Sequence, residues 1–295
     1  MNKQKIAFLV DSGSDVPEEV IKKYNMHVIP LKIIFKDQEY IDKVDISAQG
    51  VYDRLDEEIP KTSLPDGETI KNMLLKIKEE GYDKVIAVTI SSGLSGTNNM
   101  VRLMSEEVED LDVFVLDTKN IGIGSGFLAI RAASYIEKGF NWEEIQEKLK
   151  KSVEKTKVFF HVPTLEYLHK GGRIGLVSSV VGNMLNLKPV ISCNEDGIYH
   201  TVAKVRGNKK SIQKTIDLAV AFAGEAKKYD IALAYGGNEA EKSMKSIREA
   251  IQDRLPKIQH IYEGPISPAL GVHTGPGLIG IGVSILDDED EKKSV

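Results

Sequence analysis

The chain contains 295 residues, of which 41% are hydrophobic and 28% are charged, a composition that is typical of globular proteins and excludes a disordered or fibrous one. Its 39 lysines and arginines against 44 aspartates and glutamates give a net charge of −5, which is the wrong sign for broad nucleic-acid binding, so we expect no nucleic-acid partner. Because the one cysteine can form no internal disulfide and no apolar run reaches the ~18 residues of a membrane helix, we expect a cytoplasmic protein without an integral membrane segment.

Apolar runs alternate with amphipathic stretches along the first half of the chain. Short apolar runs typical of buried strands occupy residues 5–10, 28–35, 84–90 and 112–116. Helices are predicted, from apolar spacing and from proline and glycine at the ends, over 17–24, 66–80, 96–107, 125–138 and 142–155. This alternation predicts an α/β domain with a mainly parallel sheet.

The second half has a different pattern. A strand is predicted over 158–162, and the glycine-rich stretch 171–207 is expected to be mostly loop. Later elements follow: helices over 209–228 and 239–254, and strands over 230–235, 257–262 and 278–286. We therefore divide the chain into an N-terminal α/β domain, a C-terminal α/β domain and a frayed tail, with the limits 1–157, 158–286 and 287–295.

Four polar loops are candidates for a binding site: 11–15 (DSGSD), 62–66 (TSLPD), 91–97 (SSGLSGT) and 271–277 (GVHTGPG). Three of them follow a predicted strand or precede a predicted helix. In open parallel sheets, ligands bind beyond the carboxyl ends of the strands. Helix N-termini at that edge offer unpaired N–H groups to an anion.

The loop 91–97 combines hydroxyl side chains with glycines between a predicted strand and a predicted helix. Glycine lets the backbone approach a ligand closely, and hydroxyls can donate to an oxyanion; alternatively, these serines and threonines only cap the helix. The loop lacks the phosphate-loop signature and any basic residue between Ser91 and Asn99. Such a loop suits a single carboxylate better than a polyphosphate.

Thr62 and His273 are two further candidates. Thr62 precedes a proline and a predicted helix, where it can cap the helix or donate to an anion. His273 lies in a predicted loop between apolar strands and can be an ordinary hydrogen-bonding residue or a donor to a bound anion. The histidines show no metal-binding spacing, so we expect no metal. Ser95, His273 and an aspartate could also form a hydrolase triad, which leaves a serine hydrolase acting on acyl esters as the alternative.

Taken together, the loops resemble the DegV family of bacterial fatty-acid-binding proteins, from about residue 6 to residue 286. Other segments that carry the resemblance are HVIPLKI at 27–33, LDTKNIGIGSG at 116–126, LEYLHKGGRIG at 165–175, LKPVI at 187–191 and DG at 196–197. Each motif alone is weak, but their order and spacing together are highly specific.

The resemblance implies a three-layer α/β/α N-terminal domain followed by a two-layer α/β C-terminal domain. It also implies that a long-chain fatty acid such as palmitate lies in a buried apolar tunnel as the ligand, with no other cofactor. Matching the family motifs residue by residue places Thr62 and Ser95 on the carboxylate, with His273 nearby.

The resemblance further implies a non-enzymatic carrier that serves lipid transport or fatty acid metabolism. In the family, such a carrier presents the acyl carboxylate to a separate ATP-dependent fatty acid kinase subunit. Arg173 and Arg206 correspond to arginines linked to the carboxylate end or to docking of the kinase. The chain departs from the family at Leu64, often glutamine, and at Asn98, often aromatic.

Burial of the acyl chain would provide most of the affinity. A sixteen-carbon acid has about 14 methylenes, and burial of each contributes about 0.8 kcal/mol, so roughly 11 kcal/mol is available before the costs of binding. Candidates for the tunnel wall, which are equally good core residues, are Ile90, Phe127, Phe159, Phe160 and Leu270.

Overall fold

The computed structural model describes residues 2–180 and 186–287. The longer helices are α1 (Glu18–Tyr24), α3 (Gly67–Glu79), α4 (Thr97–Glu106), α5 (Ile123–Glu137), α6 (Trp142–Glu154), α8 (Asn208–Ala223), α10 (Met244–Arg254) and α11 (Pro268–Thr274). The shorter ones are α2 (Ala48–Tyr52), α7 (Glu166–Lys170) and α9 (Asn238–Glu241), with 3₁₀ turns at Ser12–Ser14 and Gly175–Val180. The strands are β1 (Ile6–Asp11), β2 (His27–Ile29), β3 (Lys32–Ile34), β4 (Glu39–Ile41), β5 (Lys61–Ser63), β6 (Lys84–Thr89), β7 (Asp112–Asp117), β8 (Thr156–His161), β9 (Val190–Cys193), β10 (Tyr199–Ala203), β11 (Tyr229–Tyr235), β12 (Ile258–Pro265) and β13 (Ile279–Ile285).

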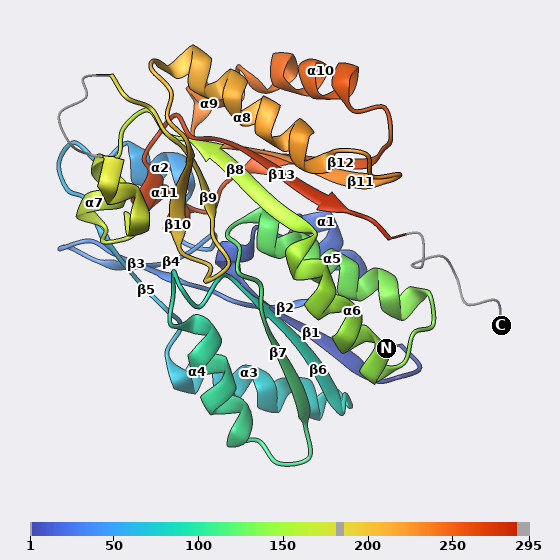
Figure 1. Cartoon of the computed structure of the whole chain (residues 1–295). Helices are drawn as coiled ribbons and strands as arrows, with labels where there is room; N and C mark the ends of the chain where they lie inside the picture. Colours follow the sequence, from blue (N-terminus) through green and yellow to red (C-terminus); the bar gives the residue numbers. More distant parts are fainter. Residues whose placement is uncertain (1, 181–185, 288–295) are drawn as a thin grey trace.

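Two sheets are stacked with helices between and outside them (Figure 1). Helices α3 and α4 cover the outer face of a four-stranded sheet, and α8 and α10 cover the outer face of a six-stranded sheet. Helices α5 and α6 lie between the two sheets, and α5 contacts strands of both. Within the ranges described, no helix combines the length and apolar character needed to cross a bilayer.

The four-stranded sheet is fully parallel, as predicted, in the order β2-β1-β6-β7. All six residues of β1 are buried, which is expected for a parallel strand covered on both faces. The chain runs from β1 to one neighbour, β2, and later returns to the other, β6. The carboxyl ends of β1 and β6 therefore form a switch point of the kind at which open α/β sheets bind ligands, and the loops 11–15 and 91–97 lie there.

Local sequence signals fix the helices that cover this sheet. The Asp66 side chain accepts a hydrogen bond from the Thr69 backbone N–H and begins α3, whose buried face consists of Ile70, Leu74 and Ile77. Asn141 and Glu144 form a reciprocal capping box at the start of α6. Each cap satisfies backbone N–H groups that a helix leaves unpaired, a contribution of about 1 kcal/mol.

The six-stranded sheet is mixed, in the order β10-β9-β8-β13-β11-β12. Only β11 and β12 pair in parallel, and the other pairs are antiparallel. The stretch 171–207, expected to be mostly loop, contains the hairpin β9–β10, so this expectation was wrong for those strands. Their residues are short runs flanked by glycine and asparagine, and antiparallel pairing around the turn at Gly197 (φ +74°) stabilises them.

A third, small sheet in the order β4-β3-β5 was missed. The single strand predicted over 28–35 is two strands, because Pro30 lacks the N–H that a continuous ladder needs and the chain changes sheets there. β3 then pairs antiparallel with β4 and β5, placing Thr62 opposite Ile33.

Two predicted helices differ from the structure, one in its length and one in its continuity. The helix expected over 209–228 ends at Ala223, because Gly224 adopts a positive φ of 50° that stops it. The helix expected over 239–254 is interrupted and forms α9 and α10. Of the tail expected over 287–295, Asp287 forms an ion pair with Lys155, and residues 288–295 lie outside the described part of the chain. The domain limits at 157 and 286 stay a prediction.

Candidate functional site

Thr62 and His273, which are 211 positions apart in the sequence, meet at the edge strand β5 of the small sheet. The Thr62 Oγ1 atom lies 2.7 Å from His273 Nε2. Thr62 belongs to β5, and His273 lies in the last turn of α11. Helix α11 contacts both β3 and β5, and this packing brings the two side chains together.

The structure corrects the predicted setting of His273 and removes one of the two alternatives for Thr62. His273 lies in a helix and not in a loop, because the Ser267 side chain caps α11 and Pro268 occupies its first turn. Thr62 does not cap α3, since Asp66 does so. Its hydroxyl is therefore available for the contact with His273.

Burial and charge keep the His273 imidazole neutral. Desolvation, and after it the positive charge of Arg173, lower the pKa of His273 to about 3. A neutral ring has one N–H, so Nε2 either donates to the Thr62 hydroxyl or accepts from it. The other ring nitrogen, Nδ1, is buried without a hydrogen-bond partner, and it lies where a Cβ on Gly171 would come within 2.2 Å.

Ser95 lies in the turn between β6 and α4. Its Oγ is 2.9 Å from Thr97 Oγ1 and accepts a long bond of 3.3 Å from the Thr97 backbone N–H, so it does contribute to the start of the helix. No histidine contacts Ser95 among the residues with described side chains, and the ring of His273 is engaged with Thr62. The serine–histidine contact required for a hydrolase triad is therefore not formed.

A cavity of about 290 Å³ adjoins Ser95 and Arg173. Arg173 Nη1 donates to the Gly171 carbonyl at 2.9 Å, and its Nε donates more weakly to the Leu94 carbonyl at 3.4 Å. The remaining walls come from the turn 92–96 and from Gly172, Gly175 and Ile198. Thus the structure brings together Ser95 and Arg173, and Arg173 also acts on the charge state of His273.

Arg206 is not part of this group. Its side chain is exposed, and its backbone forms an isolated bridge with Leu187. Among the described residues, its side chain has no hydrogen-bond or ionic partner, and it lines neither the cavity at Ser95 nor the apolar cavity described next.

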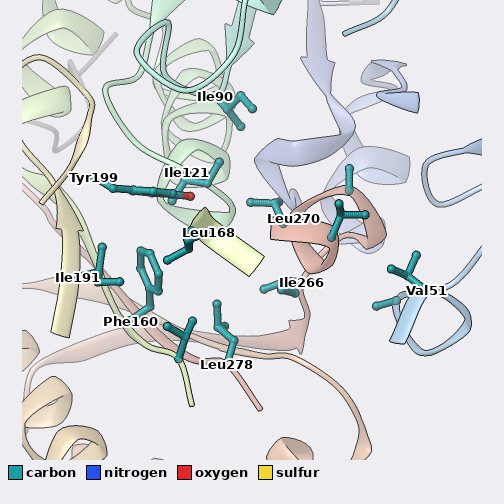
Figure 2. Close-up of a cluster of buried hydrophobic side chains, with 14 of the residues drawn as sticks. Val51, Ile90, Ile121, Phe160, Leu168, Ile191, Tyr199, Ile266, Leu270 and Leu278 are labelled. Carbon is teal, nitrogen blue, oxygen red and sulfur yellow. The ribbon is translucent and has the colours of Figure 1, made fainter. Parts of the chain in front are cut away.

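An apolar cluster includes side chains of α11, of β3 in the small sheet, and of β8, β9 and β10 in the six-stranded sheet. Figure 2 shows part of this cluster. Within it is a cavity of about 30 Å³ whose walls include Phe160, Tyr199, Leu270 and Leu278. In Figure 2 these side chains, together with Ile121, surround a common centre. Of the other proposed wall residues, Ile90 belongs to this cluster, whereas Phe127 and Phe159 pack in other parts of the core.

The loop 11–15, a candidate anion site, uses most of its polar groups internally. Asp11 accepts from the Ile90 backbone N–H and from Ser14, and Ser12 bonds to Asp42 and to the Leu31 backbone. Burial raises the pKa of Asp11 to about 6. The loop therefore joins β1 to its surroundings and has no free hydroxyl donors for an anion among these residues.

Sequence reasoning missed Gly171. Its small size allows α7 and α11 to approach closely beside His273. The glycine pair 171–172 was the only signal in the sequence, and it does not say which helix approaches.

Comparisons with known proteins identify the family of the chain. The family model described as "Uncharacterised protein, DegV family COG1307" matches residues 5–286. The chain belongs to the DegV family. A DegV domain-containing protein of Clostridium acetobutylicum is 45% identical to it over 280 residues, covering 94% of this chain and 98% of the relative.

Solved structures of DegV proteins share the whole fold. A fatty-acid-binding DegV family protein from Thermus thermophilus matches with a TM-score of 0.89 at 28% identity, over 97% of this chain and all (100%) of that one. The Fatty Acid Kinase (Fak) B3 protein of Streptococcus pneumoniae, loaded with linoleic acid, matches with a TM-score of 0.82 at 26% identity, covering 95% and 99%. The α/β fold, with a parallel N-terminal sheet and a mixed C-terminal sheet, is thus the DegV fold.

Proposed function

We propose that this protein binds a long-chain fatty acid such as palmitate. In this proposal the carboxylate lies at Thr62 and Ser95, and the acyl chain lies among the side chains of the apolar cluster that includes α11. In this proposal, the protein is a carrier that presents the acyl group to a fatty acid kinase. The fatty acids in the names of its DegV relatives support the ligand class.

The observation that carries the proposal is the pair formed by Thr62 and His273 beside the apolar cluster. Because His273 is neutral, its Nε2–H can donate to Thr62 Oγ1, and the threonine O–H is then directed to a carboxylate oxygen. Ser95 supplies a second hydroxyl donor. Each such charge-assisted bond contributes about 1.5–3 kcal/mol.

The acyl chain requires more room than the apolar cavity of about 30 Å³ provides. A ligand of that size occupies a cavity of roughly 300 Å³ or more. We therefore expect the side chains around Leu270 and Phe160 to move apart on binding, and the gain from burying methylenes offsets the cost of this movement.

A carrier function agrees with the chemistry of the polar end. The cavity beside Ser95 has Arg173 on its wall, and an arginine can bind a phosphoryl group bidentately. A carboxylate held by hydroxyls keeps its nucleophilic oxygen, so a separate kinase can phosphorylate it. The linoleic-acid-loaded Fak B3 relative supports this role.

The test is the double variant Thr62→Ala, Ser95→Ala. We expect its affinity for palmitate to fall by tenfold or more, because two hydroxyl donors are lost. Isothermal titration calorimetry with delipidated protein measures the change.

The matched control is Ser63→Ala, Ser105→Ala. It removes two nearby hydroxyls, one on β5 and one on α4, that each donate to a backbone carbonyl. Its affinity for palmitate should therefore stay within about twofold of the wild type. An unchanged affinity in the Thr62, Ser95 double variant would refute the assignment of the carboxylate site.

A further inference from the structure

Two buried polar atoms near the apolar cavity have no hydrogen-bond partner: Asp15 Oδ2 and the Tyr52 hydroxyl oxygen. Both side chains are only 8% exposed. Buried polar atoms in proteins are nearly always paired, and each unpaired one costs free energy. These two atoms therefore mark a place where the apolar interior can receive a polar group.

Asp15 holds one carboxylate oxygen in an ion pair and leaves the other without a partner. Its Oδ1 accepts from Lys43 Nζ at 2.7 Å, whereas Oδ2 lies 3.3 Å from the position that a Cβ on Gly122 would take. Asp15 and Gly122 both line the apolar cavity. Burial raises the pKa of Asp15 to about 6, while Lys43 and the nearby Ser267 backbone N–H oppose this shift. The Ser267 N–H completes no hydrogen bond to Oδ2.

Tyr52 packs against α11 beside a wall residue of the cavity. The position that a Cβ on Gly236 would take lies 3.1 Å from both the Tyr52 hydroxyl oxygen and Leu278 Cβ. A Cβ on Gly271 would lie 2.9 Å from the same hydroxyl oxygen, and the Tyr52 ring belongs to the same cluster as Ile266 and Leu270. Burial, and after it the charge of Asp15, raise the pKa of Tyr52, so the hydroxyl keeps its proton. It can therefore both donate and accept a hydrogen bond, whereas the Asp15 carboxylate oxygen only accepts.

The two atoms lie away from the proposed carboxylate site. Asp15 is close to Ser267 at the start of α11, and His273 is in its last turn. Six residues of helix separate these ends, a rise of about 9 Å. A group that reaches Asp15 must therefore be several carbons from the carboxylate of a bound fatty acid.

We propose that the cavity selects a long-chain fatty acid that carries a hydroxyl group part-way along its chain. The ligand hydroxyl donates to Asp15 Oδ2 and accepts from the Tyr52 O–H. A plain hydrocarbon chain would leave both atoms unpaired, which penalises it relative to the hydroxylated acid. This inference rests on the proposed function and specifies the ligand of the same site.

The experiment measures the affinity of delipidated protein for stearate and for a series of stearates that each carry one hydroxyl at successive chain positions. We expect one mid-chain isomer to bind about tenfold more tightly than stearate, because one charge-assisted bond is gained. In Asp15→Asn and in Tyr52→Phe, the ratio of the two affinities should fall toward one. Asparagine tolerates the left-handed backbone of Asp15 (φ 48°), and phenylalanine keeps the Tyr52 ring.

The matched controls are Asp230→Asn and Tyr229→Phe. Asp230 pairs with His260, and the Tyr229 hydroxyl accepts from the Lys257 backbone N–H, so both lie in polar contacts unrelated to the cavity and should keep the wild-type ratio. Equal binding of all isomers and stearate would overturn this inference alone. A ratio that survives in both Asp15→Asn and Tyr52→Phe would also overturn it, and failure to bind any of the acids would refute the proposed function itself.

Discussion

His273 forms its 2.7 Å contact with Thr62 as a neutral ring. Its proposed role in the site depends on this lack of charge. A protonated imidazolium would attract a carboxylate strongly but would cost much free energy in a buried position near Arg173. The neutral ring instead orients the threonine hydroxyl. We therefore expect His273 to remain uncharged at about pH 5 in NMR spectra of the imidazole nitrogens, well below the titration of an ordinary histidine.

The same shift predicts how stability depends on pH. The pKa of His273 is about 3 in the folded protein and 6.5 in the unfolded chain, so the unfolded state binds more protons between these values. The stabilising contribution of the neutral His273 ring to the free energy of unfolding is complete above pH 6.5 and is lost as the pH falls toward 3. In His273→Asn, denaturant unfolding measured across this range should depend less on pH, by about one proton. An identical pH dependence in variant and wild type would contradict the neutral buried state.

At the scale of elements, the site depends on how closely α7 approaches α11. A Cβ at Gly171 would lie 2.2 Å from His273 Nδ1 and 2.9 Å from the Tyr167 carbonyl oxygen, so one helix must shift in Gly171→Ala. We expect this variant to lose about 1–3 kcal/mol of stability and to bind palmitate more weakly, because His273 moves away from Thr62. Thermal unfolding and calorimetry measure the two effects.

Gly264→Ala is the matched control for that substitution. A Cβ at Gly264 meets no atom within 4 Å, and the residue has no positive φ. The control should therefore change the free energy of unfolding by no more than about 0.5 kcal/mol. Its affinity for palmitate should stay at the wild-type value. Wild-type behaviour of Gly171→Ala would show that the approach of α7 is not needed.

The elements also show what the sequence could predict. Continuous apolar runs such as 5–10 and 84–90 identified the buried parallel strands, since each carries its signal within a few residues. The small sheet was missed because β4 and β5 are three residues long and gain stability from pairing with β3, which is a tertiary contact. His273 was placed in a loop for a similar reason. Helix α11 is seven residues long and contains a proline, a glycine and two β-branched residues, so its packing and its Ser267 cap stabilise it more than helix propensity does.

For the proposed binding residues, the family motifs identified Thr62, Ser95, His273 and Arg173 as candidates. The fold brings Thr62 into contact with His273 and places Ser95 and Arg173 on one cavity. The motifs could not identify Asp15 Oδ2 or the Tyr52 hydroxyl as unpaired. An unpaired atom is defined by what surrounds it in three dimensions, and the surrounding residues come from distant segments such as Gly122 and Gly271.

At the scale of the whole molecule, the C-terminal half holds the loop that carries Ser95. The turn between β9 and β10 packs on this loop so closely that a Cβ at Gly93 would lie 2.8 Å from the Asp196 carbonyl oxygen. Arg173, also from the C-terminal half, donates to the Leu94 carbonyl. The polar end of the proposed ligand site therefore combines both halves of the chain, and a kinase that reaches the carboxylate must contact a surface made by both.

Arg173 is the residue that we expect to separate binding from phosphoryl transfer. A bound carboxylate has hydroxyl donors in Thr62 and Ser95, whereas the phosphoryl group that a kinase adds carries more negative charge and gains more from a nearby guanidinium. In Arg173→Ala, affinity for palmitate should change by less than about threefold, and acyl phosphate formation with a bacterial fatty acid kinase subunit should fall by a hundredfold or more. Arg248→Ala, which removes a surface arginine paired with Glu263 on the far side of the six-stranded sheet, should leave both quantities unchanged. Equal losses of binding and phosphorylation in Arg173→Ala would instead place the guanidinium on the carboxylate of the bound acid.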